Sequence, residues 1–136
     1  MTRHVSPVPP PVPLALLICD HVWQDLGTGK FHVQGTFATV GSLVFPASIN
    51  LSVHFAVTDG RGESAVRLEL VDVDEERPAV FGEELAVTFE GPRQVVEGYF
   101  AFERLEIRAP GEYRLKLFMA GEFLIERSLH VCYRVD

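Results

Sequence analysis

Hydrophobic and polar residues alternate along most of this chain with the two-residue period of a half-buried β-strand. One run places five apolar residues at alternate positions, namely Ile49, Leu51, Val53, Phe55 and Val57. Polar residues lie between them, which predicts one buried face and one solvent-exposed face that carries Ser52 and His54. A sustained helical period occurs nowhere in the sequence, so the pattern favours an all-β fold.

The alternation predicts eight strands separated by turn residues. Their expected bounds are 14–19, 30–38, 48–58, 64–72, 84–90, 95–103, 112–118 and 122–133. Glycine, proline and aspartate mark turns at Gly27-Thr28-Gly29, Asp59-Gly60, Gly91-Pro92 and Pro110-Gly111. Short strands at this spacing predict an immunoglobulin-like antiparallel β-sandwich. Within it, the second strand is expected to bury Phe31, Val33, Gly35 and Phe37.

The beginning of the chain has a different composition, with prolines at Pro7, Pro9, Pro10, Pro11 and Pro13. Proline fixes φ and lacks an amide donor, so residues 1–13 are expected to form an extended arm in front of one domain at 14–136. We expect this arm to be a solvated leader or an edge cover. The alternative function is that of a ligand for an aromatic groove.

Length and charge indicate one folded domain and argue against nucleic acid or a membrane as its partner. A chain of 136 residues with 47% hydrophobic content has the size and composition of one folded domain. Its formal net charge of −7 repels phosphate backbones, so nucleic acid is not an expected partner. Neither an apolar window of about 20 residues nor an export signal is present, which predicts a cytoplasmic protein without membrane contact. Arginine greatly outnumbers lysine, which we interpret as the bias of a GC-rich bacterial genome.

Two cysteines, Cys19 and Cys132, lie in the first and last expected strands. The ends of a sandwich can lie close together, so a disulfide is geometrically conceivable. Exported disulfide frameworks usually carry more cysteines, however, and free cysteine is among the most often buried residue types. Free cytoplasmic thiols are therefore expected.

Acidic side chains that could bind calcium form two groups. The denser group lies between the fourth and fifth expected strands: Asp72, Asp74, Glu75 and Glu76. Antiparallel order places this connection at the same end as 39–47 and 104–111, where only Glu106 adds a carboxylate, so a solvated loop is the expectation. The same order makes the opposite end a second candidate, and ordinary polar loop tips are the expectation for its acids: Asp20, Asp25, Asp59, Glu63 and Glu90.

Two histidines form a further metal candidate. His32 and His54 both point to an outer face, and if their strands are adjacent, a third ligand would complete a zinc or copper site. No HxH or HExxH spacing accompanies them, so ordinary surface histidines are the expectation.

Catalytic signals are missing. The segment 25–31 lacks the glycine and the Ser or Thr of a phosphate-binding loop, and no serine has the setting of a nucleophile elbow. Cys19, Asp20 and His21 are neighbours in a strand, so their side chains point to opposite faces and do not converge. The sequence therefore predicts neither an enzyme nor a cofactor.

Three aromatic residues, Trp23, Tyr99 and Phe118, are expected partly or wholly outside the core. Surface aromatics are frequent anchors of protein interfaces. We therefore predict a non-catalytic protein-interaction or scaffold module that binds another protein or a second copy of itself. The alternative is a sandwich that binds a cation or a small ligand, and an unmarked enzyme comes third.

The two ends of the domain carry sequence features that occur together elsewhere. These are Leu17-Ile18-Cys19-Asp20, the pattern Phe31-x-Val33-x-Gly35-x-Phe37, and Pro110-Gly111-Glu112-Tyr113-Arg114 followed by Gly121-Glu122. Together they resemble a family of short, uncharacterised bacterial β-sandwich proteins. The resemblance implies the sandwich fold and assigns no activity or site residue.

Overall fold

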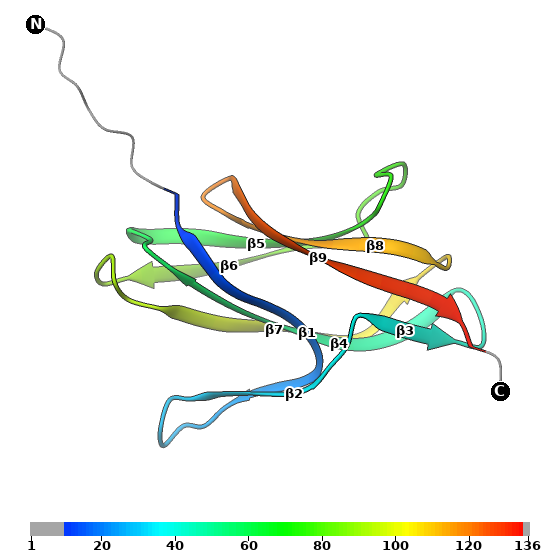
Figure 1. Ribbon diagram of the computed structural model, residues 1–136, viewed down its shortest axis with the longest axis horizontal. Helices are drawn as coiled ribbons and strands as arrows, with labels where there is room; N and C mark the ends of the chain where they lie inside the picture. The colour runs from blue at the N-terminus through cyan, green and yellow to red at the C-terminus, as the bar shows by residue number, and fades with distance from the viewer. Residues whose placement is uncertain (1–9, 135–136) are drawn as a thin grey trace, which may run out of the picture.

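The computed structural model describes residues 10–134, which form nine strands in two sheets and no helix. The four-stranded sheet has the order β2-β1-β4-β7 and the five-stranded sheet the order β3-β9-β8-β5-β6 (Figure 1). The strands are β1 (Val12–Gln24), β2 (Phe31–Thr36), β3 (Thr39–Ser42), β4 (Ala47–Thr58), β5 (Gly62–Asp72), β6 (Phe81–Phe89), β7 (Val96–Ile107), β8 (Gly111–Met119) and β9 (Glu122–Tyr133). The expected all-β sandwich is confirmed.

Strand β3 corrects the expectation of eight antiparallel strands. It lies in the segment 39–47, which was expected to be a loop, and it pairs with β9 in parallel from Thr39 opposite His130 to Ser42 opposite Tyr133. Four residues are too few for the alternation of polar and apolar positions to stand out from a loop. The other strand pairs are antiparallel.

The core lies between the two sheets and uses the alternation that the sequence displays. The apolar side of β4, from Ile49 to Val57, faces inward, and Phe55 at its centre has no exposed surface. The five-stranded sheet contributes alternate residues of β5 and β8, such as Leu68 and Leu117. Their common exclusion from water is the main stabilising contribution to the fold.

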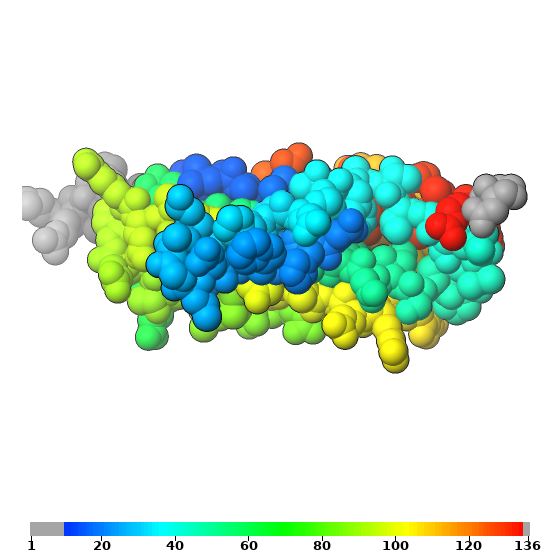
Figure 2. Space-filling view, turned by 90° about the horizontal axis from the view of Figure 1, so that it is seen from below, coloured from blue at the N-terminus to red at the C-terminus, as the bar shows by residue number. Residues whose placement is uncertain are grey.

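Strand β1 changes partner at Cys19. Before this residue it pairs with β4, and after it with β2, so that residues 20–36 form a hairpin. Figure 1 places β2 below β4 and β7, and Figure 2 shows the hairpin on the outer side of these strands. At the bend, Gly35 has a φ of 71°, and a Cβ there would collide with the Asp20 carboxylate, so glycine is required.

This third layer corrects two expectations about burial. Phe31 and Val33 do not enter the space between the sheets, because they lie on the hairpin and are only partly buried. Ser52 and His54 were expected to be exposed, but only 6% and 7% of their surfaces are accessible. The hairpin covers the polar face of β4, which the alternation alone presents to solvent.

The connection from β7 to β8 is fixed by a tyrosine at the beginning of β8. The Tyr113 hydroxyl donates a hydrogen bond to the carbonyl oxygen of Ala109 at 2.6 Å. A tyrosine that bonds back to the backbone a few residues upstream is a recurrent corner in immunoglobulin-type sandwiches. Here it holds the chain where it crosses from one sheet to the other.

Replacing Tyr113 with phenylalanine is expected to lower the free energy of unfolding by about 1 kcal/mol, because the Ala109 carbonyl loses its donor. Urea unfolding followed by circular dichroism measures this change. Tyr133→Phe is the matched control, since 60% of Tyr133 is exposed. Equal midpoints for the two variants would show that the corner contributes nothing.

Strands β6 and β7 end their sheets on the same side of the sandwich, and both leave an edge unpaired. Glu83 lies on β6 opposite Leu68, on the inward side of the sheet, yet it is exposed. A charged residue pointing inward at an edge discourages a second sheet from docking there. The sequence thus protects its open side against aggregation.

The ends of the chain and its cysteines complete the comparison with expectation. Residues 1–9 of the expected proline arm lie outside the described residues, and β1 begins at Val12, before the expected domain boundary at 14. Cys19 and Cys132 are free thiols, as expected. Between residues 10 and 134, no helix is long and apolar enough to cross a membrane.

Candidate functional site

The outer face of the β1–β2 hairpin carries an exposed aromatic pair. Trp23 of β1 and His32 of β2 are register partners, and their rings stack with centroids 4.0 Å apart and planes 9° from parallel. His21 and Gln34 are the next pair along the same face and are exposed as well. We call these four residues the Trp23 face; the indole itself is 42% exposed.

The turn of the hairpin is fixed by hydrogen bonds of its own residues. One Asp25 carboxylate oxygen accepts the amide hydrogens of Gly27 and Thr28 at 2.7 and 3.2 Å, as aspartate commonly does in turns. The Lys30 carbonyl accepts the Asp25 amide at 2.8 Å. Leu26, at the tip of this turn, is 96% exposed. The turn therefore presents an apolar side chain from a well-defined backbone.

The inner face of the hairpin holds it against the sheet. The Phe31 ring lies 6.0 Å from the ring of His54 and 6.3 Å from that of Tyr99. Beneath it, His54 Nε2 is hydrogen-bonded to Glu97 Oε2 at 2.8 Å, whereas the buried Nδ1 has no partner among the described residues. Val22, only 3% exposed, adds to this layer from β1.

The candidate pairing of His32 with His54, which was weighed against ordinary surface histidines, does not form. Strand β1 lies between β2 and β4, so the two histidines are not on adjacent strands. His54 is buried under the hairpin, whereas His32 lies on the outer face of the hairpin. The bend of β1 at Cys19, which folds β2 over the sheet, is the physical reason.

The three predicted interface aromatics do not form one patch. Tyr99 is 42% exposed on β7 and contacts Phe31 on the inner side of the hairpin, whereas Trp23 lies on the outer side of the hairpin. Phe118 pairs with Arg67 on the outer face of the other sheet, where its ring meets that of Phe123 with centroids 5.8 Å apart. The structure thus places Trp23 and Tyr99 on the same side of the sandwich, on opposite sides of the hairpin, and Phe118 on the other sheet.

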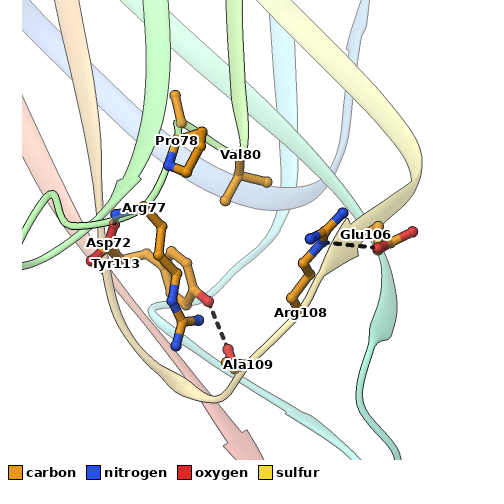
Figure 3. A pocket seen from close by; sticks show the side chains of 9 residues that line it. Asp72, Arg77, Pro78, Val80, Glu106, Arg108, Ala109 and Tyr113 are labelled. Carbon is orange, nitrogen blue, oxygen red and sulfur yellow. Dashed lines mark hydrogen bonds and ion pairs between the residues drawn. The ribbon is translucent and has the colours of Figure 1, made fainter.

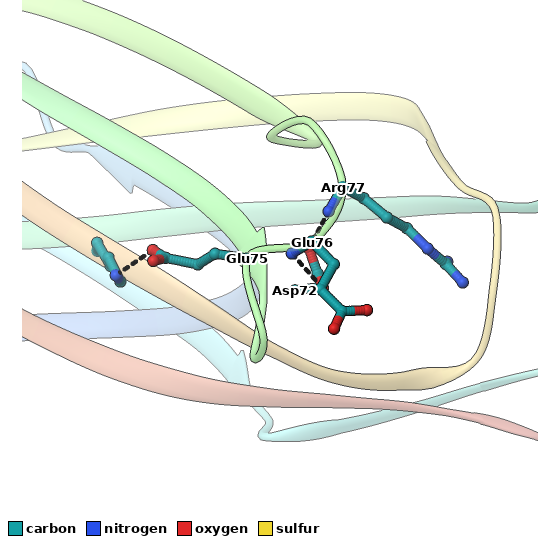
Figure 4. Close-up of polar contacts among 5 residues, drawn as sticks. Asp72, Glu75, Glu76 and Arg77 are labelled. Carbon is teal, nitrogen blue, oxygen red and sulfur yellow. Dashed lines mark hydrogen bonds and ion pairs between the residues drawn. The ribbon is translucent and has the colours of Figure 1, made fainter.

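Two carboxylates of the acidic group at 72–76 are engaged in contacts within the protein (Figure 4). The two Asp72 oxygens accept the amide hydrogens of Glu76 and Arg77, each at 3.3 Å. Glu75 forms an ion pair with Lys116 of β8 at 2.6 Å. These bonds shape the loop and occupy oxygens that a calcium ion would need.

The other candidates from the sequence remain separate. Within residues 10–134, no three side chains of His, Cys, Asp or Glu are grouped closely enough to hold a metal ion. The second acidic group therefore does not assemble into a cation site; it consists of Asp20, Asp25, Asp59, Glu63 and Glu90. Cys19 is completely buried and donates to the Ser52 carbonyl at 3.5 Å. Burial raises the pKa of this thiol, which lowers its nucleophilicity at neutral pH.

Comparison with known families covers nearly the whole sandwich. A family model described as a family of unknown function, DUF6941, matches residues 14–132. The chain belongs to DUF6941. The expected resemblance to an uncharacterised family is confirmed. No curated protein matches this DUF6941 chain.

Among solved structures, one match is the crystal structure of a β-glucosidase from Listeria innocua in complex with isofagomine. The sequence identity is 14% and the TM-score 0.46. The alignment covers 89% of the DUF6941 chain and 16% of the glucosidase chain, so the chain spans less than a fifth of that enzyme. A likeness at this level carries no argument about function.

Sequence reasoning missed several residues of the DUF6941 surface. His32 was weighed as a metal ligand, although its stacking on Trp23 is the contact that the structure records. Leu26 entered the sequence analysis only within the segment 25–31, which was compared with a phosphate-binding loop. Placing residue 23 opposite residue 32 in a hairpin would have predicted the contact between Trp23 and His32, because residues opposite each other on paired strands share a face.

Proposed function

We propose that this DUF6941 domain is an immunoglobulin-like, non-catalytic protein-interaction module whose Trp23 face binds a protein partner. The observation that carries the proposal is the exposed Trp23–His32 stack. Tryptophan is enriched among the residues that dominate binding energy at protein interfaces. With Leu26 at the tip, the hairpin presents apolar surface in a form that a partner can cover.

The rigidity of the hairpin supports this proposal. Its inner side packs through Phe31 on His54 and Tyr99, and its turn is closed by Asp25. A surface that is already ordered loses little conformational entropy when it binds. The stacked indole therefore needs little rearrangement to insert into a pocket of a partner.

The immunoglobulin-like part of the proposal has its own support, and we also propose that the protein is cytoplasmic. The Tyr113 corner is a feature of Greek-key sandwiches of the immunoglobulin type. The thiols of Cys19 and Cys132 are unpaired, as is usual in a reducing compartment. The raised pKa of the buried Cys19 thiol favours a structural role for it over a catalytic one.

Replacing Trp23 with alanine is expected to remove the principal partner from affinity captures made with the full chain in lysate of the source organism. With that partner purified, calorimetry should give a loss of about 2 kcal/mol or more, roughly thirtyfold in Kd, because a central aromatic anchor is lost. Phe123→Ala is the matched control, since Phe123 is 52% exposed on the opposite sheet. Sedimentation of the purified chain distinguishes self-association from binding to another protein.

The proposal would be overturned by a partner that binds wild type and Trp23→Ala equally while Phe123→Ala loses it. Such a result would move the interface to the outer face of the five-stranded sheet. Circular dichroism of each variant verifies that the sandwich is intact, since both residues lie outside the buried core.

A further inference from the structure

A pocket of about 790 Å³ opens at one end of the sandwich, and none of the residues of the Trp23 face lines it. The connection from β5 to β6 forms one wall and the connection from β7 to β8 the other (Figure 3). The expectation that the connections 72–83 and 104–111 share one end is confirmed here. The lining residues are Asp72, Arg77, Pro78, Ala79, Val80, Glu106, Arg108, Ala109 and Tyr113. This volume is within the range of small-molecule sites.

Two arginines and two carboxylates line the pocket, and one of the arginines forms no ion pair with the described residues. The Asp72 carboxylate accepts hydrogen bonds from two backbone amides and keeps its negative charge, and Arg108 Nε lies 3.5 Å from Glu106 Oε1. Within residues 10–134, no carboxylate forms an ion pair with the Arg77 guanidinium. In Figure 3 the Arg77 side chain extends along the wall toward Ala109. Arginine is the side chain best suited to bind carboxylate or phosphate through two parallel hydrogen bonds.

The remaining lining is suited to an apolar body. Pro78, Ala79 and Val80 form a continuous apolar segment on the same wall as Arg77. The Tyr113 ring adds an aromatic surface, and its hydroxyl is engaged with Ala109. Burial raises the pKa of Tyr113, so the phenol remains neutral at physiological pH and does not repel an anion.

We propose that this pocket binds a small organic acid, with its oxyanion at Arg77 and its apolar body against Pro78, Val80 and Tyr113. Arg108, whose side chain is 85% exposed, stands on the opposite wall and adds positive charge at the rim. The site is independent of the Trp23 face, because it is formed by other loops. It binds its ligand through the charge of an arginine, whereas the Trp23 face binds through an aromatic side chain. Carboxylates and phosphate monoesters share the required oxyanion.

The test is a titration of the isotope-labelled full chain with three probes, followed through its amide resonances. The probes are 3-phenylpropionate, phenyl phosphate and the neutral 3-phenylpropionamide. Either anion is expected to shift resonances of residues 72–80 and 106–113, and the neutral amide is not. The difference between the two anions distinguishes a carboxylate site from a phosphate site.

Two variants identify the cation. Arg77→Gln is expected to lower the affinity for the anion about tenfold or more, because a charge-assisted hydrogen bond is lost. Arg93→Gln removes an exposed arginine from the connection between β6 and β7 and should leave the affinity unchanged. The dispersion of the amide spectrum reports whether each variant is folded.

Three results would overturn the proposal. They are equal shifts with the neutral amide and the anions, an affinity that is the same in Arg77→Gln and wild type, and the absence of shifts at millimolar concentrations of both anions. The Trp23→Ala variant should bind the anion as wild type does, so failure of this site and failure of the Trp23 face are separate outcomes.

Discussion

Replacing Phe55 with alanine is expected to lower the free energy of unfolding by about 3–5 kcal/mol. Phe55 is the largest side chain with no exposed surface, and its ring packs against Phe100 with centroids 5.9 Å apart. Removal of the ring leaves a cavity between the sheets that neighbouring strands cannot fill. Because domains of this size are stable by only about 5–15 kcal/mol, urea unfolding should show a much lower midpoint.

Gly98 provides an internal control for this effect. It lies opposite Phe55 in the β4–β7 pair, and a Cβ at this position would be 2.7 Å from Phe55 Cζ. Gly98→Ala is therefore expected to destabilise wild type by about 1–3 kcal/mol and a Phe55→Leu variant by clearly less. Equal effects of Gly98→Ala in wild type and in Phe55→Leu would show that the two positions are not in contact. Separately, a loss of stability below about 1 kcal/mol for Phe55→Ala would place the ring outside the core.

The sequence could predict this part of the fold because the alternation on β4 is long and uninterrupted. Each inward residue from Ile49 to Val57 is at most 5% exposed, as the pattern requires. The turns at Asp59 and Pro110 lie between strands, as their residue types indicate. Local chemistry therefore indicates most of the strands and the turns between them, whereas the order of the strands in the two sheets comes from the fold.

The third layer could not be predicted in the same way. Alternation indicates which residues share a face, but it does not indicate whether another element covers that face. Ser52 and His54 have polar side chains and alternate correctly, so they were assigned to solvent. Only the bend at Cys19 and the requirement for glycine at Gly35 bring the hairpin over them.

The same limitation applies to the candidate sites. The sequence presents residues 72–76 as an acidic cluster, because adjacent carboxylates dominate the pattern. In the fold, Asp72 accepts two backbone amides and Glu75 pairs with Lys116, whereas the Arg77 cation forms no ion pair within residues 10–134. Which charge remains available depends on contacts across 41 residues of sequence, as for Lys116 and Glu75. The sequence of residues 72–76 alone cannot predict such a contact with a distant strand.

The inner side of the hairpin packs on the sandwich through the partly buried Phe31 ring and the buried Val22. Phe31 bridges His54 and Tyr99, and no core residue of the two sheets depends on it. The hairpin also contains Trp23, the single tryptophan of the chain. Intrinsic fluorescence therefore reports on this layer, whereas circular dichroism reports on the whole sandwich.

Replacing Phe31 with alanine is expected to release the hairpin without unfolding the sheets. Loss of this contact should lower the free energy of local opening by about 1–2 kcal/mol and accelerate amide exchange in residues 20–36 roughly five- to thirtyfold. Phe118→Ala, which removes a partly buried phenylalanine from the opposite face, should leave that exchange unchanged. The Trp23 fluorescence transition in urea should then precede the circular dichroism transition. Coincident transitions, with exchange accelerated equally in β4 and β8, would instead make the hairpin part of the same cooperative unit as the core.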